Sequence, residues 1–138
     1  MKITIAGSMA FAKEQIDIKN KLEEMGHEVQ VSDDIFDYAN SPKLKLSFEK
    51  ELELSLKHDI LKTFYKKIAD SDALFVCNLN KNNIDGYLGT SMLMEISLAY
   101  YLNKKIYLLN DFDKNQGYAL EVSIINPVVL NGDFKKII

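Results

Sequence analysis

Glu95 stands in an otherwise apolar stretch, residues 89–100, that has the spacing of a helix. At about 100° per residue, Glu95 points in the same direction as Met92, Leu98 and Ala99, the side that faces a core. A solvated helical glutamate is the ordinary alternative. Desolvating an ionised carboxylate without partners is costly, so a chain that keeps one on an apolar face pairs it, protonates it or uses it at a cleft.

A carboxylate on a pocket wall can attack an electrophilic sugar carbon, and this covalent route splits substitution at an anomeric centre into two easier steps. A partner must then stabilise or protonate the departing group. The candidates lie near predicted strands, and the sequence does not choose among them: Asn78, Asp72, Asp85 and Asp111. Asn78 directly follows the central strand, where its amide could read a nucleobase edge. For each acid, a turn or helix stop is the more ordinary role.

The loop after the first predicted strand could bind the substrate. It lacks the GxGxxG pattern of dinucleotide sites and the GxxxxGK[ST] pattern of phosphate loops, so we predict no cofactor. Gly7 allows close backbone approach, and Ser8 with the free amides of the next helix could hold a hydroxyl or a phosphate. A turn glycine and an N-cap serine explain the same residues equally well.

Aromatic side chains could provide a stacking surface or a hydroxyl that orients Glu95. Aromatic residues at helical spacing are nevertheless more often part of a core. The candidates are Phe11, Tyr65, Tyr87 and Tyr100.

The order of elements predicts a single α/β domain over residues 1–138. We expect parallel strands near residues 2–6, 28–31, 73–77, 105–109 and 127–130, with helices over 8–25, 60–68, 89–102 and 118–125. These elements predict a doubly wound, flavodoxin-like sheet of order 2-1-3-4-5, covered by helices on both faces. Ligands of such sheets bind beyond the carboxyl ends of strands 1 and 3. The segment 37–56 has no clear period.

Composition restricts the possible partners. With 17 basic and 20 acidic residues, the chain is not built to follow polymeric nucleic acid, whereas a small ligand fits. No apolar stretch is long enough to span a membrane and the N-terminus begins a strand, so we expect a cytoplasmic protein.

We also predict no metal site, because the two histidines and one cysteine form no zinc-ligand spacing. Cys77 ends an apolar run, which favours an inert buried thiol. A nucleophilic pair of Cys77 with His58 is the weaker alternative.

Three stretches together, residues 2–8, 71–78 and 86–100, resemble the nucleoside 2-deoxyribosyltransferase-like family, which contains deoxyribosyltransferases and deoxynucleotide N-hydrolases. The resemblance implies that Glu95 attacks C1′ of a 2′-deoxynucleoside, expels the base and forms a covalent deoxyribosyl-enzyme. The sugar then passes to another base or to water. It also implies that Gly7, Ser8 and Ser91 lie near the sugar or its 5′ group.

The resemblance further implies a homo-oligomer in which a neighbour's C-terminal segment completes the pocket, and Asn131 lies in the corresponding segment. The predicted catalytic residues are therefore Glu95, Asn78 and Asp72. The predicted substrate-binding residues are Gly7, Ser8, Met9, Phe11, Gly89, Ser91 and Asn131.

The sequence departs from the family at two positions, and two other functions are possible. Asn78 stands where transferases carry an aspartate, and Thr4 and Ile5 occupy the stretch where some members carry a tyrosine. The first alternative is a non-catalytic nucleotide or nucleotide-sugar sensor on the same scaffold. A phosphoribohydrolase ranks last, because its Gly-Thr-x-x-Glu pattern fails when Gly89-Thr90 is followed by glutamate only at position 95.

Overall fold

The computed structural model describes residues 1–41 and 45–138. It has one five-stranded, all-parallel sheet of order β2-β1-β3-β4-β5, which confirms the predicted fold class. The strands are β1 (Lys2–Gly7), β2 (Glu28–Gln30), β3 (Ala73–Cys77), β4 (Lys105–Leu108) and β5 (Val128–Val129).

The pairing of β1 with β3 forms the centre of the sheet. Its register runs from Ile3 opposite Ala73 to Gly7 opposite Cys77. Every residue of β3 is buried, as expected for a continuous apolar run in a parallel strand covered on both faces. Because the strands are parallel, their carboxyl ends meet at one edge, and the winding reverses between these two strands.

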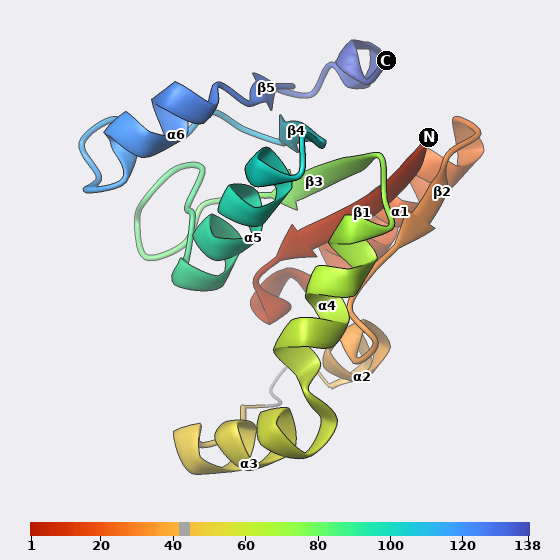
Figure 1. Cartoon of the computed structure of the whole chain (residues 1–138), viewed down its shortest axis with the longest axis vertical. Coiled ribbons are helices and arrows are strands. Elements are labelled where there is room, and N and C mark those ends of the chain that lie inside the picture. Colours follow the sequence, from red (N-terminus) through yellow and green to blue (C-terminus); the bar gives the residue numbers. More distant parts are fainter. Residues whose placement is uncertain (42–44) are drawn as a thin grey trace.

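Helices cover both faces of the sheet (Figure 1). One core lies between the sheet and α1 (Ala12–Glu24), α2 (Ile35–Asn40) and the C-terminal segment with η2 (Phe134–Lys136). The other lies under α4 (Ile60–Ala69), α5 (Thr90–Tyr101) and α6 (Ala119–Ile125). A short 3-10 helix, η1 (Met9–Phe11), joins β1 to α1.

Residues 37–56, for which the sequence shows no clear period, are partly helical. They overlap the end of α2 and most of α3 (Phe48–His58), while Pro42 lies outside the described residues. The Ser47 hydroxyl caps α3 by accepting from the Lys50 amide at 3.2 Å, and Asp59, with φ 47°, separates α3 from α4. Phe48, Leu52 and Leu56 of α3 remain exposed, so the period of this helix could not be read as a core stripe.

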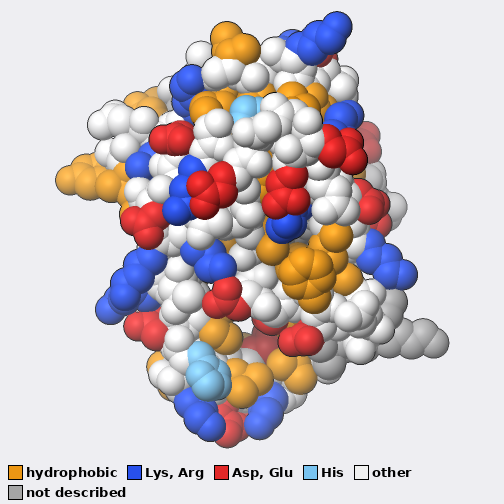
Figure 2. All heavy atoms as spheres, turned by 90° about the vertical axis from the view of Figure 1, so that its right-hand side faces the viewer, with side chains coloured by type: hydrophobic (Ala, Val, Ile, Leu, Met, Phe, Trp, Pro, Cys, Tyr) orange, Lys and Arg blue, Asp and Glu red, His pale blue; other side chains and the backbone are white. Residues whose placement is uncertain are grey.

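The α3 end of the molecule projects from the rest (Figure 1). Figure 2 shows hydrophobic side chains on this lower end and a hollow between it and the sheet-bearing part. The start of α4 connects the two parts, so residues from this region can reach the carboxyl edge of the sheet.

The inward face of α1 combines apolar and polar residues. Ile18 and Leu22 are buried in the core, and Gln15 on the same helix is 1% exposed. The helix ends at Glu24, and Met25, just beyond it, is 42% exposed.

Within residues 1–41 and 45–138, no helix combines the length and the apolar character required to cross a membrane.

Gly86 is a position where the backbone excludes any other residue, and this gives a first prediction. Its φ is 62°, and a Cβ there would lie 1.8 Å from the Asp111 carbonyl oxygen. Gly86→Ala should therefore lower the free energy of unfolding by about 3 kcal/mol and the melting temperature by roughly 10 °C. Gly117→Ala is the matched control, because a Cβ at Gly117 meets nothing within 4 Å. Equal melting temperatures for the two variants would contradict the prediction.

Candidate active site

A cavity of about 450 Å³ opens at the carboxyl edge of the sheet. Its walls come from the loops after β1, β2 and β3, from the first turns of α5, and from α3 and the first turns of α4. The lining residues form two groups by sequence. The N-terminal half contributes Gly7, Ser8, Met9, Ser32, Ser55, Ile60, Leu61 and Phe64; the C-terminal half contributes Lys81, Tyr87, Gly89, Thr90, Ser91, Met92 and Glu95.

Glu95 lies in the second turn of α5 and lines this cavity. It is 8% exposed, and burial raises the pKa of its carboxyl group to about 8. No ion pair or hydrogen bond from the described residues offsets this rise. At neutral pH the free protein therefore holds Glu95 mainly protonated, which is typical of a functional rather than a solvated carboxyl group.

The packing of α5 keeps Glu95 in this position. Met92, Ile96 and Ala99 are buried in the core under α5, on the side of the helix that also carries Glu95. The helix begins after Gly89, where an added Cβ would lie 3.3 Å from the Tyr87 ring. A glycine at this point therefore lets the Tyr87 ring lie against the helix start and form part of the wall.

The buried side chain of Gln15, on α1, holds the loop after β1 in place. Its Nε2 donates to the Ser8 carbonyl oxygen at 2.8 Å, and a Cβ on Gly7 would lie 2.9 Å from the Gln15 side chain. The Ser8 hydroxyl accepts from the Ala10 amide at 3.3 Å and from Lys81 Nζ at 2.9 Å. Ser8 is thus a cap of η1, and its hydroxyl also faces the cavity.

The structure brings six of the predicted site residues together around the cavity and leaves four outside it. Gathered at the cavity are Gly7, Ser8, Met9, Gly89, Ser91 and Glu95. Phe11, Asn78, Asp72 and Asn131 are not among the residues of its lining. Phe11 is half-buried in η1, directly after the loop that does line the cavity.

Asn78 has a different role from the predicted one. Its side chain is 0% exposed, and its Nδ2 donates to the carbonyl oxygens of Gly86 at 3.3 Å and Asn110 at 2.7 Å. Its Oδ1 accepts from the Asn110 amide at 3.0 Å. Because both amide hydrogens bond backbone carbonyls, Asn78 joins two loops and cannot read a base. The prediction that it takes part in the chemistry is wrong for this reason.

Asp72 lies at the opposite edge of the sheet from the cavity. It immediately precedes β3, and its Oδ2 accepts from the Lys2 amide, at the start of β1, at 2.8 Å. The prediction of a catalytic Asp72 is wrong, because parallel strands place their amino ends far from their carboxyl ends.

The remaining acids and Asn131 lie on the surface. Asp85 accepts from Asn80 at 2.6 Å, and Asp111 pairs with Lys114 at 2.7 Å. Asn131 is exposed beyond β5, and its contact with a neighbouring copy stays a prediction.

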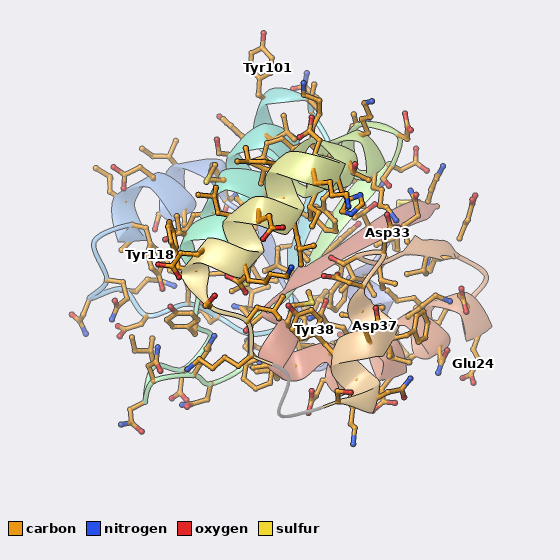
Figure 3. The ribbon with its side chains drawn as sticks, turned by 90° about the horizontal axis from the view of Figure 1, so that it is seen from below. Glu24, Asp33, Asp37, Tyr38, Tyr101 and Tyr118 are labelled. Carbon is orange, nitrogen blue, oxygen red and sulfur yellow. The ribbon has the colours of Figure 1, made fainter. Side chains whose placement is uncertain are left out.

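Two more of the aromatic candidates are not among the residues of the cavity lining. Tyr65, on α4, is half-buried, and burial, followed by the nearby charge of Glu95, raises the pKa of its hydroxyl, so this tyrosine lies close to Glu95. Tyr100 lies at the far end of α5 beside Tyr101, which points away from the body of the molecule (Figure 3). Tyr87 is therefore the predicted aromatic residue that contributes to the wall.

Cys77 is buried and inert. Burial raises the pKa of its thiol to about 12, so the thiolate that a nucleophile requires is absent at neutral pH. In the part of the chain that the structure describes, no three histidine, cysteine, aspartate or glutamate side chains come together as a metal site.

Several lining residues were missed from the sequence. The sequence position of Lys81, a basic residue in the polar loop after the buried central strand, indicates a place at the carboxyl edge of the sheet. The position of Ser32, directly after the second strand, indicates the same. The helical period of Ile60, Leu61 and Phe64 indicates only an amphipathic helix and does not point to a cavity.

Comparison with known proteins identifies the fold. No family model matches the chain, and no curated protein matches it in sequence. Among solved structures, the CMP N-glycosidase BcmB of Clostridium botulinum superimposes with a TM-score of 0.52 at 19% identity, over 94% of this chain and 85% of that one. The two proteins share a fold. BcmB thus provides a second sequence, very different from this one, that forms the same architecture.

The raised pKa of Glu95 predicts how stability depends on pH. The folded state binds this proton more tightly than the unfolded state, so stability present at pH 5 is lost as the pH rises through about 8. Glu95→Gln removes the titration, and its free energy of unfolding relative to wild type should increase by up to about 4 kcal/mol between pH 5 and 9. Urea denaturation across this range measures the difference.

Glu121→Gln, on the exposed surface of α6, is the control for this series. The free energy of unfolding of Glu121→Gln relative to wild type should not increase between pH 5 and 9. A Glu95→Gln difference that stays constant with pH would mean that the carboxyl group is not held protonated by burial.

Proposed function

We propose that this protein cleaves the N-glycosidic bond of a nucleoside or nucleotide, with Glu95 as the nucleophile that attacks C1′ of the sugar. The observation that carries the proposal is the position of Glu95: a nearly buried carboxyl group, without a partner among the described residues, on the wall of the cavity at the winding reversal. A carboxyl group that is costly to bury and has no structural partner is best explained by a reaction.

The rest of the cavity suits such a substrate. Its volume of about 450 Å³ lies within the usual range for small-molecule sites, roughly 300–1,000 Å³. Tyr87 and Phe64 offer aromatic surface for a base, while Ser8, Thr90 and Ser91 offer hydroxyl groups for the sugar.

The bond changes follow from this placement. The deprotonated Glu95 forms a C–O bond at C1′ while the C1′–N bond breaks, and the base leaves with the bonding electron pair. The base takes its proton from water, since Glu95 is the one carboxyl group among the described residues of the lining. Water, or a second base, then attacks C1′ and releases Glu95.

The fold shared with BcmB supports this assignment. BcmB is a CMP N-glycosidase, and this chain has the same architecture. The resemblance to deoxyribosyltransferases and deoxynucleotide N-hydrolases gives 2′-deoxynucleosides and their 5′-monophosphates as the first substrates to test, with CMP beside them.

A binding module is the second candidate, and the protonated state of Glu95 favours it. A carboxyl group with a pKa of about 8 can donate a hydrogen bond to a sugar hydroxyl without reacting. A nucleotide sensor built this way would bind its ligand below pH 8 and release no base.

The nucleophile can be tested by trapping. Incubation with 2-fluorinated deoxynucleosides and their monophosphates should give a covalent adduct that peptide mass spectrometry locates on Glu95. Glu95→Gln and Glu95→Ala should lower turnover by about 10³-fold or more, because a covalent route without its nucleophile is lost. Glu121→Gln should retain full activity. Unlabelled Glu95 together with undiminished turnover in both variants would refute the proposal.

The same substrate panel separates hydrolysis from transfer. Chromatography that shows free base without an acceptor base indicates a hydrolase. A new nucleoside that forms only when an acceptor base is present indicates a transferase.

The pH profile distinguishes the enzyme from the sensor. Because the nucleophile must be deprotonated, kcat/KM should rise about tenfold per pH unit below about 8 and level off above it. Ligand binding by a sensor that uses the protonated carboxyl group has the opposite dependence. A kcat/KM that falls as the pH rises toward 8 would argue against Glu95 as the attacking group.

A further inference from the structure

One face of α3 carries an apolar stripe that remains open to solvent. Phe48, Leu52 and Leu56 recur every four residues and therefore lie on the same face of the helix. Phe48 is 75% exposed and Leu56 is 76% exposed, and no described residue of α3 is buried. A soluble protein rarely leaves a row of large apolar side chains uncovered, so this stripe marks an interaction surface.

Glutamates border the stripe on both sides. At about 100° per residue, Glu49 and Glu53 follow one side of it and Glu51 follows the other. All three side chains are exposed. Of the three, only Glu53 has an ion-pair partner among the described residues, Lys50 at 3.6 Å. The stripe and its glutamates, here called the α3 surface, therefore suit a partner that is apolar with a basic border.

A groove of about 640 Å³ at the other edge of the sheet has this character. It lies at the amino ends of β4 and β5, where α5 and α6 end. Tyr100, Val128 and Ile138 are exposed along it, so its apolar surface is open to solvent. The apolar residues of its lining are Tyr100, Ile106, Tyr107, Ile125, Pro127, Val128 and Ile138.

Three lysines also line this groove: Lys104, Lys105 and Lys136. The ammonium group of Lys104 donates to the carbonyl oxygen of Ala69 at 2.8 Å. That of Lys136 donates to the carbonyl oxygen of Val129 at 3.2 Å. No carboxylate side chain of the described residues pairs with the three lysines, so their ammonium groups keep hydrogens to donate. The groove with its lysines, here called the basic groove, thus presents positive charge around an apolar floor.

The α3 surface and the basic groove cannot meet within one chain, because they lie at opposite ends of the molecule (Figure 1). Pairing of α3 with α3 of another copy is also disfavoured. It would bring the two glutamate borders together, and like charges that face each other oppose association. The two surfaces complement each other in charge and in apolar character only when they belong to different copies.

We propose that copies of this protein associate head to tail, with the α3 surface of one copy seated in the basic groove of the next. The apolar stripe covers the floor of the groove, and the glutamates of one border pair with the lysines of the other. Such a contact is heterologous, so it builds a ring where the rotation between copies closes and an open chain where it does not. This inference is independent of the proposed reaction.

The contact has two physical consequences. One helix face covers a small area, so the association is weak and depends on protein concentration. Its charged borders are exposed, so salt weakens it. Ser55, on the same helix, lines the cavity that holds Glu95, so the neighbouring copy lies beside the candidate active site.

Sedimentation velocity over a range of protein concentrations tests the contact. Wild type should associate as the concentration rises, and raising the salt concentration from about 50 to 500 mM should weaken the association by about tenfold or more. The α3 variant Phe48→Gln/Leu56→Gln and the groove variant Lys105→Glu/Lys136→Glu should each weaken it by about tenfold or more. The four residues are exposed, so the melting temperatures should stay within about 3 °C of wild type.

A mixture of the two variants shows which surfaces meet. The α3 variant keeps an intact groove, and the groove variant keeps an intact α3 surface. The mixture should therefore form a dimer with one copy of each variant and no larger species. If the groove variant alone associates as strongly as wild type, α3 pairs with something other than the groove, and the inference is overturned.

Two control variants match these changes in chemistry. Leu120→Gln/Ile124→Gln removes exposed apolar side chains from α6, and Lys66→Glu/Lys135→Glu reverses two exposed charges outside the groove. Both controls should associate like wild type. A wild type that stays monomeric at every concentration would overturn the inference, as would equal losses of association in the controls and in the α3 and groove variants.

Discussion

The parallel pairing of β1 with β3 is the constraint on which the site depends. Five residue pairs, from Ile3 with Ala73 to Gly7 with Cys77, hold the two strands in register, so both end at the same level of the sheet. The loop that carries Ser8 and the loop that carries Lys81 consequently start side by side. The 2.9 Å bond between these two side chains joins segments 73 residues apart in the chain.

The site is maintained at a cost to stability. Burial of Glu95 in an apolar wall opposes its ionisation, and no described partner compensates for it. Neighbouring polar residues are treated differently: the Asn78 amide and the Gln15 amide both have backbone partners. The amides that support the cavity are therefore bonded within the protein, whereas the carboxyl group that we propose to react has no partner among the described residues and lines the cavity.

In the proposed reaction Glu95 acts at the anomeric carbon. Side chains of the cavity that hold a non-reacting part of the substrate would keep C1′ against the carboxyl group, which is how binding away from the reacting bond contributes to catalysis. The aromatic and hydroxyl side chains of the lining, among them Tyr87, Phe64 and Ser91, suit one small molecule rather than a polymer.

The periodicity of the sequence determined the fold and the location of the site. Apolar runs at 2–6 and 73–77 and helical stripes between them specify a doubly wound sheet, because strand and helix periods differ and parallel strands need long crossovers. The same logic located the crevice, and a carboxyl group on the apolar face of a helix marked Glu95. Residues directly after strand ends, such as Ser8, could also be predicted.

Tertiary structure decided which polar residues remain available. Asn78 and Lys81 both follow β3 in the sequence, yet the first bonds loop backbone and the second faces the cavity. Asp72 is near β3 in sequence but at its amino end, at the other edge of the sheet. The contribution of α3 and α4 to the wall likewise depends on how distant segments pack, which local periodicity does not encode. Hydrogen-bond partners across the fold, rather than residue type, separate a structural amide from a functional one.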